Sequence, residues 1–293
     1  MDAVHERPAA RLDRVPPATY FVGSAVFHYL GPAFAVLLFA LVPPLGVAWL
    51  RIAAAAAVFA AWRRPWRTLA ALDAAGLRLV AGMGAVLAVM NACFYVAIDR
   101  LPLGTVAAIE FLPVILLAAL GARTPRNWAA LVLAVGGVNL LTNVQLEAAP
   151  VGLAFAFANA ALFALYIVLA HRVARHGAMA GIDGLAVAML IALVVATPLG
   201  GWAALPALLD PVALLAGIGV GITSSVIPYV CDQLAMARMP RATYALLVSL
   251  LPATATAIGV VVLRQIPAPA EIAGVALVVA GVGVHREPSE TAR

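Results

Sequence analysis

Residues 151–170 read VGLAFAFANAALFALYIVLA and contain no charged side chain. A helix needs roughly 20 apolar residues to cross the hydrocarbon core of a bilayer, so this segment has the length and composition of one crossing. A second run without Asp, Glu, Lys or Arg extends from Val15 to Val42. Across the chain, 65% of the residues are hydrophobic and 11% are charged, and the mean hydropathy is +1.05. These values lie far from those of a soluble domain and predict an integral membrane protein.

Proline, glycine and charged residues divide the whole chain into ten apolar pieces of this kind, which predicts an all-α integral membrane protein with ten transmembrane helices. The breaks at residues 42–44 and 100–102 are short, so counts of eight or nine crossings stay open. The expected spans are 17–41, 43–62, 77–98, 103–121, 126–142, 151–171, 182–201, 212–236, 241–263 and 269–285.

The basic residues, all of them arginine, predict the orientation of the chain. If the N-terminus lies inside, all but three of the 18 arginines fall in inner segments, while Arg100 and Arg264 fall in outer loops and Arg51 lies within a span. Cytoplasmic segments carry the excess of positive charge in membrane proteins. Both termini are therefore expected in the cytoplasm, and the net charge of +5 is explained by topology without any nucleic-acid partner.

Two short motifs indicate an internal duplication. Arg100-Leu101-Pro102 is followed by Thr105, and Arg238-Met239-Pro240 is followed by Thr243, each between two expected spans. Five spans per copy is an odd number, so the second copy must cross the membrane in the opposite direction. Such inverted repeats hold the substrate between the halves, near the bilayer midplane. The expected division is a tail (1–14), two inverted five-helix repeats (15–142 and 151–285) and a second tail (286–293).

Several stretches carry a resemblance to a known family: Met90-Asn91-Ala92-Cys93-Phe94-Tyr95, Leu101-Pro102-Leu103-Gly104, Ala108-Ile109-Glu110-Phe111, Tyr166-Ile167, His176-Gly177 and Ser225-Val226-Ile227-Pro228-Tyr229. They resemble the threonine/homoserine exporters, which are EamA-type members of the drug/metabolite transporter superfamily. The resemblance implies ten helices in two inverted repeats, and export of small amino acids across the bacterial inner membrane in exchange for protons.

The chain departs from the pattern of that family at three places. Glu110-Phe111-Leu112-Pro113 is one residue shorter than the family's Glu-Phe-x-Gly-Pro, Leu251 replaces a glutamate, and Arg264-Gln265 replaces a Gly-Glu pair. The identity of the substrate and the coupling to protons therefore stay open. The alternative is efflux of another small metabolite or of a hydrophobic drug.

Arg51 and Glu110 are charged residues inside expected spans, where a charge costs several kcal/mol unless it pairs or faces water. Counted from the span ends at a 1.5 Å rise per residue, both lie roughly 10–12 Å below the outer surface, and Asn91 lies at a similar depth. The three residues are expected to form a polar cluster. This cluster either takes part in transport or only ties helices together, with equal weight. For Glu110 alone we favour transport, because a buried carboxylate can take up and release a proton.

Other polar residues in the spans are weaker candidates. His28 is slightly favoured as a helix-to-helix hydrogen bond over substrate binding or proton relay. Asp232 is favoured as an interfacial salt bridge to Arg238. Tyr166 and Tyr229 are candidates for substrate binding because a phenol donates a hydrogen bond without carrying a charge. Tyr95 is expected in the interfacial aromatic belt instead. The helix-kink candidates, each lacking one backbone N–H, are Pro32, Pro113, Pro228 and Pro252.

The sequence gives no sign of a cofactor, a metal site or catalysis. Cys93 and Cys231 fall inside apolar spans, where a thiol acts as a small packing residue. An intramembrane enzyme needs a clustered nucleophile and base, and the nearest histidine pair, His171 and His176, lies at the cytoplasmic edge of a span. A receptor needs an extramembrane module, and the loops are short. The expected partners are the lipid bilayer, a small-molecule substrate and a proton.

Overall fold

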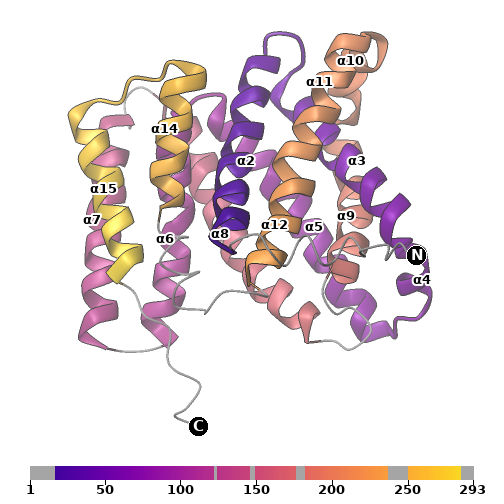
Figure 1. Cartoon of the computed structure of the whole chain (residues 1–293), viewed down its shortest axis with the longest axis horizontal. Coiled ribbons are helices and arrows are strands. Elements are labelled where there is room, and N and C mark those ends of the chain that lie inside the picture. The colour runs from indigo at the N-terminus through magenta and orange to yellow at the C-terminus, as the bar shows by residue number, and fades with distance from the viewer. Residues whose placement is uncertain (1–16, 122–123, 146–148, 176–181, 237–249, 285–293) are drawn as a thin grey trace, which may run out of the picture.

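The protein is an all-helical bundle in the part of the chain that the computed structural model describes. The prediction of an all-α fold is confirmed, and the helices run side by side along one direction of the molecule (Figure 1). The described residues are 17–121, 124–145, 149–175, 182–236 and 250–284. The helices are α2 (Pro17–Leu38), α3 (Pro44–Arg63), α4 (Pro65–Ala70), α5 (Ala74–Ile98), α6 (Leu103–Gly121), α7 (Pro125–Gln145), α8 (Pro150–Ala174), α9 (Ile182–Ala196), α10 (Leu205–Leu209), α11 (Pro211–Gly221), α12 (Ile227–Met236), α14 (Leu251–Leu263) and α15 (Pro269–Val284), with π-helical turns η2 (Thr197–Gly201) and η4 (Ile222–Val226) and a 3-10 turn η3 (Trp202–Ala204).

Six of the described helical segments are long and apolar enough to cross a membrane, and α6, α14 and α15 contribute shorter apolar segments. Large apolar side chains cover the outside of the bundle. Val132 is 69% exposed, Leu215 is 69% exposed and Val261 is 80% exposed. A soluble protein rarely exposes so many large apolar side chains, so the outside of the bundle suits lipid. The six segments are Thr19–Leu38, Pro44–Arg63, Ala74–Ile98, Pro150–Ala174, Ile182–Leu209 and Pro211–Cys231.

The residues at the helix N-termini explain why the sequence predicts where the spans begin. Proline at the first helical position needs no N–H partner and already has a helical φ. Asp73 caps α5, because its Oδ1 accepts a hydrogen bond from the Gly76 N–H at 2.8 Å. Asp210 caps α11 in the same way through the Val212 N–H at 2.9 Å. The helices that begin on proline include α3, α7, α8, α11 and α15.

Two features differ from the expected spans. The seventh span was expected to end at residue 201, but helical structure continues through η2, η3 and α10 to Leu209. Pro198 and Pro206 each sit in the first turn of a new helical segment, so they change the type of helix without ending it. The short helix α4, which begins at Pro65, was not expected either.

The helices pack in a definite order. Helix α7 packs on α15, α3 on α9 and α11, and α5 on α8 and α9, while α2 packs on α12 and α14, and α6 on α8 and α14. Figure 1 places α7 and α15 together at one side of the bundle and α3 and α9 at the other. Two polar contacts tie α3 to the span that begins with α9, one from Arg63 to Asp183 at 2.7 Å and one from Trp49 to Thr197 at 3.0 Å. Gln145 and Glu271 tie α7 to α15 at 2.7 Å.

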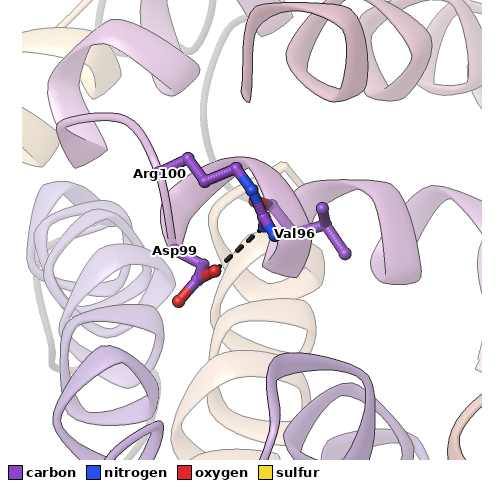
Figure 2. A network of polar contacts seen from close by, with 3 residues as sticks. All are labelled: Val96, Asp99 and Arg100. Carbon is purple, nitrogen blue, oxygen red and sulfur yellow. Dashed lines mark hydrogen bonds and ion pairs between the residues drawn. The ribbon is translucent and has the colours of Figure 1, made fainter. Parts of the chain in front are cut away.

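Arg100 closes the junction between α5 and α6. Its Nη1 donates a hydrogen bond to the Val96 carbonyl at 3.0 Å. The same nitrogen donates to Asp99 Oδ2 at 2.9 Å, the contact drawn as a dashed line in Figure 2. A cation is favourable at the C-terminal end of a helix, where carbonyl groups lack partners. Arg100 therefore has a structural role here. The related motif that contains Arg238 lies outside the described residues.

Candidate functional site

Arg51 is buried and hydrogen-bonded to residues of the second half of the chain. The side chain, on α3, is only 8% exposed. Its Nε donates to Ser225 Oγ at 2.9 Å and its Nη2 donates to the Ser224 carbonyl at 3.0 Å. The guanidinium also lies 5.6 Å from the centre of the Tyr95 ring, within the range of a cation–π contact. Arg51 is thus held by neutral groups of η4 and α5.

Pro228, two residues after the π-helical turn η4, frees a hydrogen-bond partner for Arg51. In an α-helix the N–H of residue 228 would donate to the carbonyl of Ser224, but Pro228 has no N–H. That carbonyl instead accepts the hydrogen bond from Arg51. A π-turn inside a helix often occurs at a functional site. One proline thereby leaves a buried carbonyl group available to a buried cation.

Two glycines let the neighbouring helices approach η4 closely. A Cβ at Gly31 of α2 would lie 2.8 Å from the Ser224 nitrogen and 2.9 Å from its Cα. A Cβ at Gly221 would lie 2.6 Å from the Ala54 Cβ and 2.8 Å from the Arg51 carbonyl oxygen. These distances are too short for any residue larger than glycine without movement of the backbone. The positions of α2 and α3 against η4 depend on both glycines.

Glu110 forms the second charged part of the site. It lies on α6, is 8% exposed, and its Oε1 accepts a hydrogen bond from Asn159 Nδ2 of α8 at 3.1 Å. Asn159 is fully buried. Arg51 and the hydroxyl of Tyr29 on α2 are both within electrostatic range of the Glu110 carboxylate. Residues from α2, α3, α6 and α8 therefore share one electrostatic environment.

Several polar atoms of this environment lack a hydrogen-bond partner within the described part of the chain. They are the hydroxyls of Tyr29, Tyr95 and Ser224 and the Oδ1 of Asn159. Buried polar groups are nearly always hydrogen-bonded, because leaving one unpaired costs free energy. A site with several such groups around two opposite charges is suited to binding a small polar molecule. We call these four residues, with Arg51, Glu110 and Ser225, the central polar cluster.

The three residues expected in one cluster have different hydrogen-bond partners. Arg51 and Glu110 lie within electrostatic range of each other, and the Asn91 amide donates to the Leu87 carbonyl of its own helix at 2.8 Å. His28 lies beside the cluster, with its ring 5.1 Å from that of Tyr29, and is within electrostatic range of Arg51. The expectation of Tyr95 in an interfacial belt is wrong: its side chain is fully buried next to Arg51.

The remaining predicted residues lie at the edge of the cluster or away from it. Tyr166 and Tyr229 both pack against the apolar cluster that contains Ile52, Leu87 and Met90. Asp232 lies in α12, and its expected partner Arg238 lies outside the described residues. Among the prolines, Pro32 lies inside α2, Pro113 inside α6, Pro228 two residues after η4, and Pro252 in the first turn of α14.

A separate pocket opens between the ends of α6, α14 and α15. Its empty volume is about 320 Å³. Three of its lining side chains are already hydrogen-bonded: Gln265 Oε1 accepts from the Leu103 N–H at 3.0 Å, Glu271 Oε2 accepts from the Ala268 N–H at 2.8 Å, and Thr256 Oγ1 donates to the Pro252 carbonyl at 2.9 Å. The lining residues are Pro102, Gly104, Thr105, Thr256, Gln265, Ile266, Pro267, Glu271 and Val275. These side chains are distinct from the central polar cluster.

Known proteins resemble this chain over most of its length. The sequence model of the EamA-like transporter family matches residues 150–285. The threonine/homoserine exporter RhtA of Escherichia coli strain K12 is 31% identical over 253 residues, which cover 85% of this chain and 84% of RhtA. RhtA of Salmonella typhimurium strain LT2 is 32% identical over 266 residues, or 88% of each chain. The chain belongs to the EamA-like transporter family.

Membership of this family establishes the broad function. The EamA-like protein is a membrane transporter and not an enzyme, and its relatives point to the bacterial inner membrane. The resemblance identified from the sequence is confirmed. A protein of known crystal structure also matches with a TM-score of 0.54 and 22% identity, covering 92% of this chain and 97% of the other. That likeness supports the helical fold alone.

Proposed function

We propose that this EamA-like transporter exports small amino acids related to threonine and homoserine. The observation that carries the proposal is the central polar cluster, in which α2, α3, α5 and α6 meet α8 and η4 around two buried charges. Carriers built from two halves bind their substrates between the halves. The relatives named as threonine/homoserine exporters, 31–32% identical over most of the chain, give the substrate class.

The proposed architecture is ten spans in two inverted repeats, with both termini in the cytoplasm. The two units are residues 15–142 and 151–285, flanked by the tails 1–14 and 286–293. The helix pairs support it: α2 packs on α12 and α14 as α8 packs on α5 and α6. Three helices of the first half pack on the helices that hold the same place in the second half: α3 on α9, α6 on α14 and α7 on α15. A two-fold relation between halves generates this pattern of pairs.

The proposed energy source is the proton gradient, with Glu110 as the proton-carrying group. Its carboxylate is buried and hydrogen-bonded to a neutral amide, so a proton can neutralise it at a low cost in hydrogen bonds. In this exchange, Glu110 takes up a proton from the side of the membrane to which the substrate is released. Proton uptake and substrate release then alternate. Export should therefore weaken when a protonophore collapses the gradient.

Efflux from cells loaded with dipeptides tests the proposed function. Threonine-containing dipeptides raise the cytoplasmic threonine concentration, and a strain that produces the protein should release threonine into the medium faster than the same strain without it. A leucine-containing dipeptide serves as the control for substrate size, and leucine release should not change. If no amino acid leaves the cells faster, another small metabolite or a hydrophobic drug becomes the substrate class to examine.

A further inference from the structure

The two ends of the central polar cluster differ in chemistry. Around Arg51 the contacts are the Ser225 hydroxyl, the Ser224 carbonyl and the Tyr95 ring. In the part of the chain that the structure describes, the ion pairs join Arg63 to Asp183 and Arg100 to Asp99, so Arg51 has no carboxylate in direct contact. Within the described ranges, the groups in direct contact with the Arg51 guanidinium are therefore neutral.

Arg51 has hydrogen-bonding capacity left. A guanidinium carries five N–H groups, and the structure uses two of its nitrogens in hydrogen bonds. The Tyr95 hydroxyl lies within interaction range of the Ser224 hydroxyl and of the Arg51 guanidinium, and neither hydroxyl makes a well-formed hydrogen bond among the described residues. A carboxylate accepts several hydrogen bonds and pairs with a guanidinium through two of them. The unused donors beside Arg51 match a carboxylate.

The other end of the cluster presents acceptors. The Glu110 carboxylate accepts from the Asn159 amide, whose own Oδ1 has no partner within the described ranges. The Tyr29 hydroxyl, also without a partner there, lies within electrostatic range of Glu110. An ammonium group has three donors and no acceptor. This end therefore has the charge and the acceptors that an ammonium group needs.

We infer that Arg51, with the Tyr95 and Ser224 hydroxyls, forms the subsite for the substrate carboxylate, and that the substrate ammonium faces Glu110 and Asn159. This inference rests on the proposed function and adds the orientation of the substrate to it. Specificity then follows from charge: a molecule without a carboxylate leaves Arg51 unpaired, and that loss lowers its affinity. A charge-assisted hydrogen bond contributes about 1.5–3 kcal/mol, which corresponds to roughly tenfold to a hundredfold in affinity.

The test measures binding to the purified full-length protein for three probes: L-threonine, L-threoninamide, which lacks the carboxylate, and lactate, which lacks the ammonium. The wild-type protein should bind threonine roughly tenfold or more tightly than threoninamide. Arg51→Gln should bind threonine only as weakly as threoninamide. Arg63→Gln is the matched control, because Arg63 lies on the same helix, outside the cluster, in contact with Asp183. Its ratio of affinities should equal that of the wild type.

Tyr95→Phe keeps the inference testable if Arg51→Gln does not fold, because the Tyr95 hydroxyl has no hydrogen-bond partner in the described part of the protein. Removing it should weaken threonine binding by roughly threefold to tenfold and leave threoninamide binding unchanged. An unchanged ratio in both folded variants would overturn the inference while leaving amino-acid export intact. If the wild type binds lactate but not threonine, the carboxylate subsite stands and the proposed function fails. If it binds none of the three probes, the carboxylate subsite and the proposed function are both wrong.

Discussion

Replacing Glu110 with glutamine is expected to reduce amino-acid export to the level of cells that lack the protein. Glutamine has nearly the same shape and keeps an oxygen that can accept the hydrogen bond from Asn159, so the fold should persist. It cannot take up a proton, and it removes the negative charge that faces Arg51 and Tyr29. The measurement is threonine efflux from dipeptide-loaded cells, with the amount of protein in the membrane fixed by immunoblot.

Glu271→Gln provides the control for this variant, because Glu271 is the other buried glutamate among the described residues. Its carboxylate ties α15 to Gln145 and to the Ala268 N–H, outside the cluster, so most of the export should remain. A protonophore should slow the wild-type and Glu271→Gln proteins equally. If Glu110→Gln exports threonine at the wild-type rate and with the same sensitivity to the protonophore, Glu110 is not the proton-carrying group.

Gly31→Ala is expected to cause the second large loss, through packing. The added methyl would meet the Ser224 nitrogen at 2.8 Å and its Cα at 2.9 Å, and backbone atoms cannot move aside alone. Overpacking of this kind costs about 1–3 kcal/mol, and the displacement of η4 would also carry Ser224 away from Arg51. Both the temperature of thermal unfolding in detergent and threonine efflux should fall.

Gly23→Ala on the same helix is the matched control for Gly31→Ala. Among the described residues, a methyl group there meets Cys231 Sγ alone, at 3.8 Å, which is an ordinary contact distance. Alanine also favours the helix over glycine by about 1 kcal/mol, so stability should stay the same or rise. Equal unfolding temperatures and equal efflux for the two variants would show that α2 does not depend on close contact with η4.

The helix boundaries were largely predictable because they depend on local chemistry. The expected span 103–121 coincides with α6, and α7, α8, α11 and α15 begin within one residue of their expected starts, at prolines. The extension to Leu209 was missed because a proline in the first turn of a new segment reads the same as one that ends a helix. The span expected at 241–263 is described only from Leu250, the residue before α14, to the end of that helix.

The hydrogen-bond partners in the site were harder to predict from the sequence than the charged residues. Counting residues from a span end gives the depth of a side chain but not the direction in which it points around its helix. Arg51 and Glu110 lie within electrostatic range of each other but bond to different partners, and Asn91 at a similar depth bonds to its own helix. Asn159 was visible as the single amide in residues 151–170, and Ser224 as the residue four before Pro228, yet neither carries a charge that would mark it.

The central claim is that two oppositely oriented halves enclose the cluster, and it requires the connection between the halves to face the outside. Asn143, exposed near the end of α7, is replaced by cysteine in a Cys93→Ala, Cys231→Ala background, and labelled in spheroplasts with a membrane-impermeant maleimide. Arg67→Cys, on the exposed surface of α4, serves as the inner control. We predict labelling at position 143 in intact spheroplasts and at position 67 only after lysis. Labelling at position 143 only after lysis would contradict the account.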